Sequence, residues 1–274
     1  MKSSTKVHLL CIDPQNDFCN PQGALFVPGA DEDMQRLVSM TTRLNDVWDD
    51  IHVTLDSHHE IHIAHPVVWK DAAGNHPDPF TLITASDVEN GVWMPINPNW
   101  RDRFLAYTRS LEQNGRYVLV IWPVHCVIGS WGHSIVPELS DAFRVWEKTQ
   151  IANVDYVTKG SNSWTEHYSA VKADVEDQND PGTQLNFDLI NTLKTADIIA
   201  ITGEALSHCV ANTIRDIADN FGEENIKKFV LIKDTCSNVP TFEQLGDDFV
   251  NEMAKRGMEV DNADSFLSKT VVAV

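Results

Sequence analysis

The stretch DIIAITGEALSHCV, residues 197–210, decides the fold of this chain. Its first six residues contain a short apolar run at 198–201, which is typical of a strand buried in a sheet. The residues after Gly203 continue as a turn and then an amphipathic helix, with Cys209 in its first turn. Open α/β sheets form their binding sites beyond the carboxyl ends of the strands, where this turn is expected to lie. The positive end of the helix dipole favours a thiolate there. The alternative is that Cys209 is a small apolar residue packed in the helix.

Strand-like and helix-like segments alternate along the chain. We expect strands at 7–12, 51–55, 117–121, 154–157, 197–202 and 227–233. We expect helices at 34–48, 100–113, 137–148, 187–193, 207–220 and 242–256. Such alternation is typical of βαβ crossovers, so the sequence predicts an α/β fold in which helices cover both faces of a parallel sheet. We expect one domain over residues 1–274, with an inserted segment rich in histidine, tryptophan and proline at roughly 66–99.

Composition limits the classes of function. The 274 residues are 42% hydrophobic, which is enough for a sizeable core. The sequence contains no run of 18 apolar residues, so we expect no membrane span. The formal charge of −19 argues against a nucleic-acid partner, whose phosphates need lysine and arginine. The five cysteines are scattered, and the first strand leaves no room for a signal peptide, so we expect a cytoplasmic protein with free thiols. The composition leaves open whether the chain forms a homo-oligomer.

Reactive side chains follow several of the expected strands. They are Asp13 after 7–12, Asp56 and His58 after 51–55, His125 after 117–121, Lys159 after 154–157 and Cys209 after 197–202. The carboxyl ends of parallel strands converge on one edge of a sheet. An acid, a lysine, metal-type ligands and a thiol are therefore expected to lie together.

In these motifs the sequence resembles the isochorismatase-like cysteine hydrolases, and among them the nicotinamidase branch. The resemblance runs from about residue 6 to about residue 240 and implies the isochorismatase-like hydrolase fold. Asp13 in DPQNDF matches the family's catalytic aspartate, Lys159 in KG its lysine, and Cys209 its nucleophile. The family also implies an oxyanion hole from the backbone N–H groups of Ala205 and Cys209, often with a cis peptide just before the alanine. True isochorismatases lack the cysteine, which argues against their reaction here.

The resemblance implies a metal centre as well. Asp56 and His58 in D-x-H, and His125 in WPVHC, match the metal ligands of the nicotinamidases. One carboxylate and two imidazoles suit a divalent transition metal, zinc in the first place, with iron and manganese as alternatives. His62 is a candidate for a further ligand or for a residue that supports the ligands. The alternative for each histidine is an ordinary hydrogen-bonded turn residue.

Aromatic side chains are expected around the substrate. The family lines its pocket with aromatics at three positions that match Phe18, Trp122 and Tyr168. A flat heteroaromatic ring would stack on such side chains, although each of them could instead be core packing. A lid over the site is a weaker expectation for three residues of the insert, Trp69, Phe80 and Trp93.

A nucleophilic thiol needs a base or a charge that stabilises its thiolate. His208 is adjacent to Cys209, but neighbours in a helix point about 100° apart, so it is a poor partner. Asp13 is the better base, and Lys159 supplies the balancing positive charge. The alternatives are a turn cap before a proline for Asp13 and a surface lysine for Lys159.

The resemblance implies an amidase that converts nicotinamide to nicotinate and ammonia through a cysteine thioester. One alternative is a related cysteine hydrolase acting on another small amide. The other is a non-catalytic family member that binds a small ligand, which the joint presence of Asp13, Lys159 and Cys209 disfavours. The chain departs from the family pattern in its insert and in Glu204, which replaces a small apolar residue beside Ala205.

Overall fold

A computed structural model describes residues 5–115 and 117–268, and its centre is a six-stranded parallel sheet. The strand order is β10-β9-β8-β1-β2-β7. The bounds are β1 Val7–Ile12, β2 Trp48–Asp56, β7 Asp155–Lys159, β8 Ile198–Gly203, β9 Phe229–Ile232 and β10 Glu259–Asp261. The order reverses between β1 and β8, and ligands of open α/β sheets bind beside such a switch point. The predicted α/β fold with a parallel sheet is confirmed.

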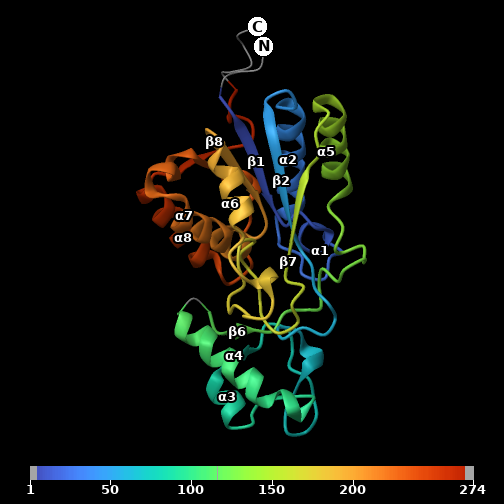
Figure 1. Cartoon of the computed structure of the whole chain (residues 1–274). Helices are drawn as coiled ribbons and strands as arrows, with labels where there is room; N and C mark the ends of the chain where they lie inside the picture. Colours follow the sequence, from blue (N-terminus) through green and yellow to red (C-terminus); the bar gives the residue numbers. More distant parts are fainter. Residues whose placement is uncertain (1–4, 116, 269–274) are drawn as a thin grey trace.

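Helices cover both faces of this sheet (Figure 1). On one face α2 (Ala30–Arg43) packs against α5 (Pro137–Gln150), and the other face carries α6 (Phe187–Lys194), α7 (Ala211–Phe221) and α8 (Glu243–Arg256). Strands β1 and β9 are buried along their whole length, which explains their continuous apolar sequences. The short elements are α1 Asn16–Cys19, η3 Pro181–Thr183, η5 Glu223–Lys228 and η6 Lys233–Thr235. No helix within the described ranges is both long and apolar enough to cross a bilayer.

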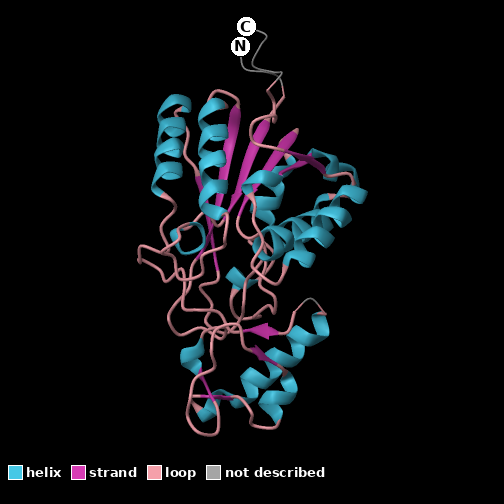
Figure 2. Ribbon diagram, turned by 180° about the vertical axis from the view of Figure 1, so that it is seen from behind, coloured by secondary structure: helices cyan, strands magenta, loops and turns pink. Residues whose placement is uncertain are grey.

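A small lobe lies at the carboxyl end of the sheet and is joined to it by loops (Figures 1 and 2). Its elements are η1 Pro66–Val68, β3 Trp69–Lys70, β4 Leu82–Ile83, α3 Ala85–Glu89, β5 Met94–Pro95, η2 Pro98–Trp100, α4 Arg101–Asn114 and β6 Leu119–Val120. The lobe thus contains the predicted insert together with α4 and β6. Trp69 is fully buried and packs on Phe104 with the ring centroids 4.6 Å apart, so it belongs to the core of the lobe and the lid prediction for it is wrong.

The expected strand at 117–121 does not join the parallel sheet. Only β6 forms there, and it pairs antiparallel with β4 inside the small lobe. An apolar run predicts a buried strand but carries no information about which sheet the strand joins. The loop that bears His125 therefore reaches the site from the lobe and not from the central sheet.

The first helix and second strand share a boundary that the sequence pattern misplaced. Helix α2 covers 30–43, and Trp48, expected at the end of the helix, is the first residue of β2. Its fully buried ring donates a hydrogen bond to the Thr41 carbonyl of α2. Trp48 therefore packs against the helix from β2 and is not part of the apolar face of the helix itself. The edge strand β10 was not expected, because its sequence EVD has no apolar run.

Candidate active site

Asp13 is the first residue after β1 and is fully buried. Its Oδ1 accepts a hydrogen bond from Thr54 Oγ1 at 2.5 Å, and its Oδ2 lies 3.0 Å from Lys159 Nζ. The Asp13 N–H also donates to Thr54 Oγ1, at 3.0 Å. The carboxylate is therefore held between β2 and β7 and does not act as a cap for the turn at Pro14.

Lys159 is the last residue of β7, and its ammonium group is the centre of the site. Nζ lies 3.0 Å from an oxygen of Asp13 and 3.0 Å from an oxygen of Asp56. It donates to the His167 carbonyl at 2.9 Å and lies 3.6 Å from Cys209 Sγ. With only 2% of the residue exposed, the alternative of a surface lysine is wrong.

Cys209 lies in a π-helical turn, Leu206–Val210, that directly precedes α7. The predicted α-helix from residue 207 therefore begins only at Ala211, because a single-turn π segment has no distinct sequence period. Gly203 makes the close approach of this turn to β1 possible. It has a φ of 110°, and a Cβ at this position would lie 2.0 Å from the Ile12 carbonyl oxygen.

Burial and charge set the protonation of this group. Burial raises the pKa of the Cys209 thiol well above its usual value, Lys159 opposes the shift and Asp13 adds to it. Burial also raises the pKa of Asp13, against the effect of Lys159. Burial alone would lower the pKa of Lys159, but Asp13 and Asp56 raise it well above its usual value. The ammonium is therefore charged at neutral pH, while Cys209 rests as a thiol and not as the thiolate expected from the helix dipole.

Asp56, His58 and His125 converge beside the lysine, and we call them the edge trio. Asp56 Oδ2 lies 3.0 Å from His58 Nε2 and 3.4 Å from His125 Nε2. The other ring nitrogens are held by backbone carbonyls, His58 Nδ1 by Gly160 at 3.0 Å and His125 Nδ1 by Pro123 at 2.8 Å. His58 Nε2 is buried, and the partner that it faces is the Asp56 carboxylate. One carboxylate oxygen and two oriented imidazoles with converging nitrogens suit a divalent metal ion.

The neighbouring histidines surround the edge trio without completing it. His62 lies 4.3 Å from His58 between ring centroids. Its Nδ1 accepts from the Ala64 N–H at 3.2 Å, and its Nε2 lies 3.1 Å from the Thr165 carbonyl. With both nitrogens engaged, His62 fits the supporting role and not that of a further ligand. His65 is also buried and packs edge-on against His125 with centroids 5.5 Å apart.

A pocket lies between the thiol and the edge trio. All three aromatic residues predicted for it, Phe18, Trp122 and Tyr168, line it. Trp122 Nε1 donates to the Tyr168 hydroxyl at 3.0 Å, which fixes both rings. The remaining lining residues are Leu25, Val27, Asp56, His125, Glu166, Ala205, His208, Cys209 and Val239. The walls are therefore mainly apolar and aromatic, with a thiol and metal-type ligands among them.

Three polar residues of the site were missed by the sequence reasoning. Gln15 fixes the end of β2 by two hydrogen bonds, because its side-chain amide donates to the Asp56 carbonyl and accepts from the Asp56 N–H, both at 2.7 Å. His167 Nδ1 accepts from the Gly160 N–H at 3.0 Å, and Glu166 lines the pocket. Gln15 stands inside the DPQNDF motif and could have been found there. Glu166 and His167 follow no apolar run or motif.

Comparison with known proteins finds similarity to nicotinamidases and pyrazinamidases. No family model matches the chain. The curated nicotinamidase of Saccharomyces cerevisiae is 28% identical over 213 residues, which cover 77% of this chain and 81% of that protein. The structure of the yeast nicotinamidase bound to the inhibitor nicotinaldehyde superposes with a TM-score of 0.64, at 21% identity, over 93% of this chain and 99% of the other. A Pyrococcus horikoshii pyrazinamidase in complex with zinc gives 0.55, at 20% identity, over 94% and 99%.

The resemblance to the nicotinamidase branch of the isochorismatase-like hydrolases is confirmed. The peptide between Glu204 and Ala205 is cis, as the family led us to expect. Glu204, the departure from the family pattern, is fully buried, and its Oε2 accepts from the Ser237 N–H at 3.0 Å. Burial and the nearby Asp33 raise the pKa of Glu204 well above its usual value. The carboxyl group of Glu204 is therefore held toward its protonated form beside Asp33 and Ser237.

Proposed function

We propose that this protein is an amidohydrolase that cleaves nicotinamide to nicotinate and ammonia. The observation that carries the proposal is the position of Lys159 Nζ, 3.0 Å from Asp13 Oδ2 and 3.6 Å from Cys209 Sγ, the thiol that lines an aromatic pocket. A binding protein has no use for a buried acid, lysine and thiol in mutual contact. The curated relative that the chain matches is a nicotinamidase.

The thiol and the carboxylate act as one proton-transfer unit. Because the thiol is neutral at rest, Asp13 takes its proton as Cys209 Sγ attacks the amide carbon. The N–H groups of Ala205 and Cys209 would donate hydrogen bonds to the carbonyl oxygen as negative charge develops on it, each worth ~3–4 kcal/mol in such a hole. Asp13 then gives the proton to the departing ammonia. A water molecule that is deprotonated by Asp13 hydrolyses the thioester and restores the thiol.

The edge trio would hold a divalent metal ion, for which we propose zinc before iron or manganese. When bound, such an ion supplies a Lewis acid for the ring nitrogen of a pyridine carboxamide. Phe18, Trp122 and Tyr168 would stack on or border the flat ring and keep its amide toward Cys209. Lys159 stays charged throughout and compensates the two carboxylates that it contacts.

Ammonia release over a panel of amides tests the proposal. We expect turnover of nicotinamide and pyrazinamide by the purified protein, and its loss after dialysis against a chelator with recovery on adding zinc. The panel includes aliphatic amides of similar size. Turnover of an aliphatic amide without turnover of nicotinamide would mean a related cysteine hydrolase with another substrate. Release from none of the amides would leave a ligand-binding protein and contradict the proposal.

A further inference from the structure

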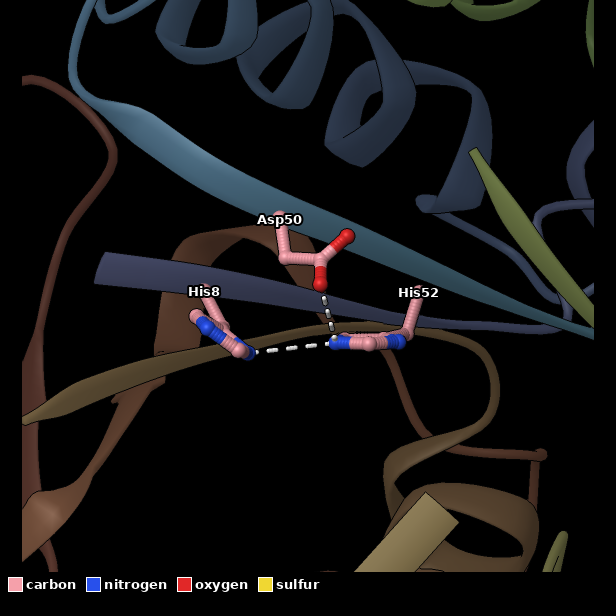
Figure 3. Close-up of side chains that lie close together, drawn as sticks. All are labelled: His8, Asp50 and His52. Atoms are coloured by element: carbon pink, nitrogen blue, oxygen red, sulfur yellow. Dashed lines mark hydrogen bonds and ion pairs between the residues drawn. The ribbon is translucent and has the colours of Figure 1, made fainter. Parts of the chain in front are cut away.

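A second group of metal-type ligands lies in the amino half of the sheet, away from the pocket. His8 on β1 points toward Asp50 and His52 on β2 (Figure 3). In the parallel register His8 pairs with Asp50, and Leu10 pairs with His52, so the three side chains share one face of the sheet. We call them the strand trio.

The distances within the strand trio are those of a metal site. His8 Nδ1 lies 3.2 Å from His52 Nε2, and His52 Nε2 lies 4.0 Å from Asp50 Oδ2. All three ligand atoms lie within 4.8 Å of one another. Tetrahedral zinc with Zn–N bonds of about 2.0–2.1 Å separates two nitrogens by roughly 3.3 Å. The two imidazoles are therefore already spaced for a shared ion.

The surroundings of the strand trio fit the same role. His8 and His52 are 3% and 1% exposed, and each sits on a rigid strand. Asp155 of β7 lies with Oδ2 2.9 Å from His52 Nδ1, the carboxylate–imidazole contact that orients metal-binding histidines and leaves Nε2 free. Asp50, His52 and Asp155 also line an open surface hollow, which provides a path for an ion.

We propose that His8, Asp50 and His52 bind a second divalent transition metal of the zinc class, with a fourth coordination position open to the hollow. The site is separate from the edge trio, because His52 precedes Asp56 by four residues on the same strand, roughly 13 Å at the usual rise. In the metal-free protein one imidazole N–H donates to the other ring. In the loaded site His8 takes its Nε2–H tautomer, so that Nδ1 can bind the ion.

The experiment measures how many metal ions bind to a variant that lacks both histidines of the edge trio. The double variant His58→Ala/His125→Ala is stripped with chelator and titrated with Co²⁺, whose visible absorption reports tetrahedral coordination. We expect one Co²⁺ per chain with a tetrahedral spectrum, displaced by one equivalent of Zn²⁺. Wild-type protein should bind two ions. Absence of the ion in the double variant, with one in wild type, would overturn the proposal and leave a hydrogen-bonded imidazole pair.

Further substitutions in the double variant locate the ion. His8→Gln and His52→Gln should each abolish binding, and Asp155→Asn should weaken it about 10–100-fold because it frees the orientation of His52. His76→Gln removes an exposed histidine of the small lobe and should leave binding unchanged. If the substitution of a buried histidine prevents folding, Asp50→Asn serves instead, since Asp50 is partly exposed and should still cost at least tenfold. Equal affinity in Asp50→Asn and Asp155→Asn variants and the parent would contradict the assignment.

Discussion

The edge trio and the strand trio use the same residue types, and both include residues of β2, yet their surroundings differ. The edge trio lies at the carboxyl end of β2, includes His125 from a loop of the small lobe, and lies beside Lys159 and the aromatic pocket. The strand trio lies inside the sheet and opens to a surface hollow. Residue type determines which ion a site can hold, whereas its place in the sheet determines whether the ion can meet a substrate and a nucleophile.

The largest expected effect is the loss of activity when the thiol is removed and both trios are left intact. Cys209→Ala should abolish turnover, because the attacking sulfur is gone, while the metal content and the thermal unfolding temperature stay near wild type. Cys236→Ala, which removes another buried thiol, should retain most activity. A Cys209→Ala variant that keeps more than about a hundredth of wild-type kcat would exclude nucleophilic catalysis at this residue.

Substrate choice tests whether the edge trio alone meets the substrate. Nicotinamide and pyrazinamide offer a ring nitrogen meta to the amide, whereas benzamide has the same shape without it. We expect kcat/KM for nicotinamide to exceed that for benzamide on the order of a thousandfold or more, because benzamide leaves a built polar site unpaired. His125→Ala should remove most of this ratio, and His8→Gln should not change it. Equal turnover of the two amides by wild type would show that no metal selects the ring.

The contact between Lys159 and Cys209 tests whether a neighbouring positive charge controls the reactivity of the thiol. In Lys159→Met the loss of a cation 3.6 Å from Cys209 Sγ raises the pKa of the thiol further. Alkylation by iodoacetamide requires the thiolate, so the rate at a fixed pH should fall roughly tenfold or more, and its pH profile should move to higher pH. Mass spectrometry of the labelled peptide measures the rate. Circular dichroism checks folding, and identical pH profiles for variant and wild type would speak against the coupled group.

The smallest effect concerns a buried carboxyl outside both trios. The folded-state pKa of Glu204 is raised, so its contribution to stability is fully present below its unfolded pKa near 4.5 and is lost as the pH rises through the folded value. Gln in its place can still accept from the Ser237 N–H and donate to Asp33. At pH 8, Glu204→Gln should therefore raise the unfolding temperature by roughly 2–4 °C, the shift that ~1 kcal/mol produces in a chain of this size.

The advantage of Glu204→Gln should shrink toward pH 5, because the ionisation that favours the unfolded chain becomes weaker as the pH approaches the unfolded pKa near 4.5. Thermal melts at several pH values measure it. A gain that is the same at pH 5 and pH 8 would mean that the side chain, and not its ionisation, determines the difference.

The sequence by itself determined the class of fold and the position of the edge site. Apolar runs and amphipathic stretches are local patterns, and they predicted the strands and helices of the central sheet because burial imposes its period on each segment separately. The motifs at the strand ends predicted that Asp13, Asp56, Lys159 and Cys209 would meet, since parallel strands bring their carboxyl ends to one edge.

Only the tertiary structure decided which segments pair. The run at 117–121 joins the small lobe, and the turn with Cys209 is a π-helix. The strand trio exists because the register between β1 and β2 places His8 opposite Asp50, and a shift of one residue would send one strand's side chains to the other face. Register is fixed by packing between segments that are far apart in the chain, and local periodicity does not contain it.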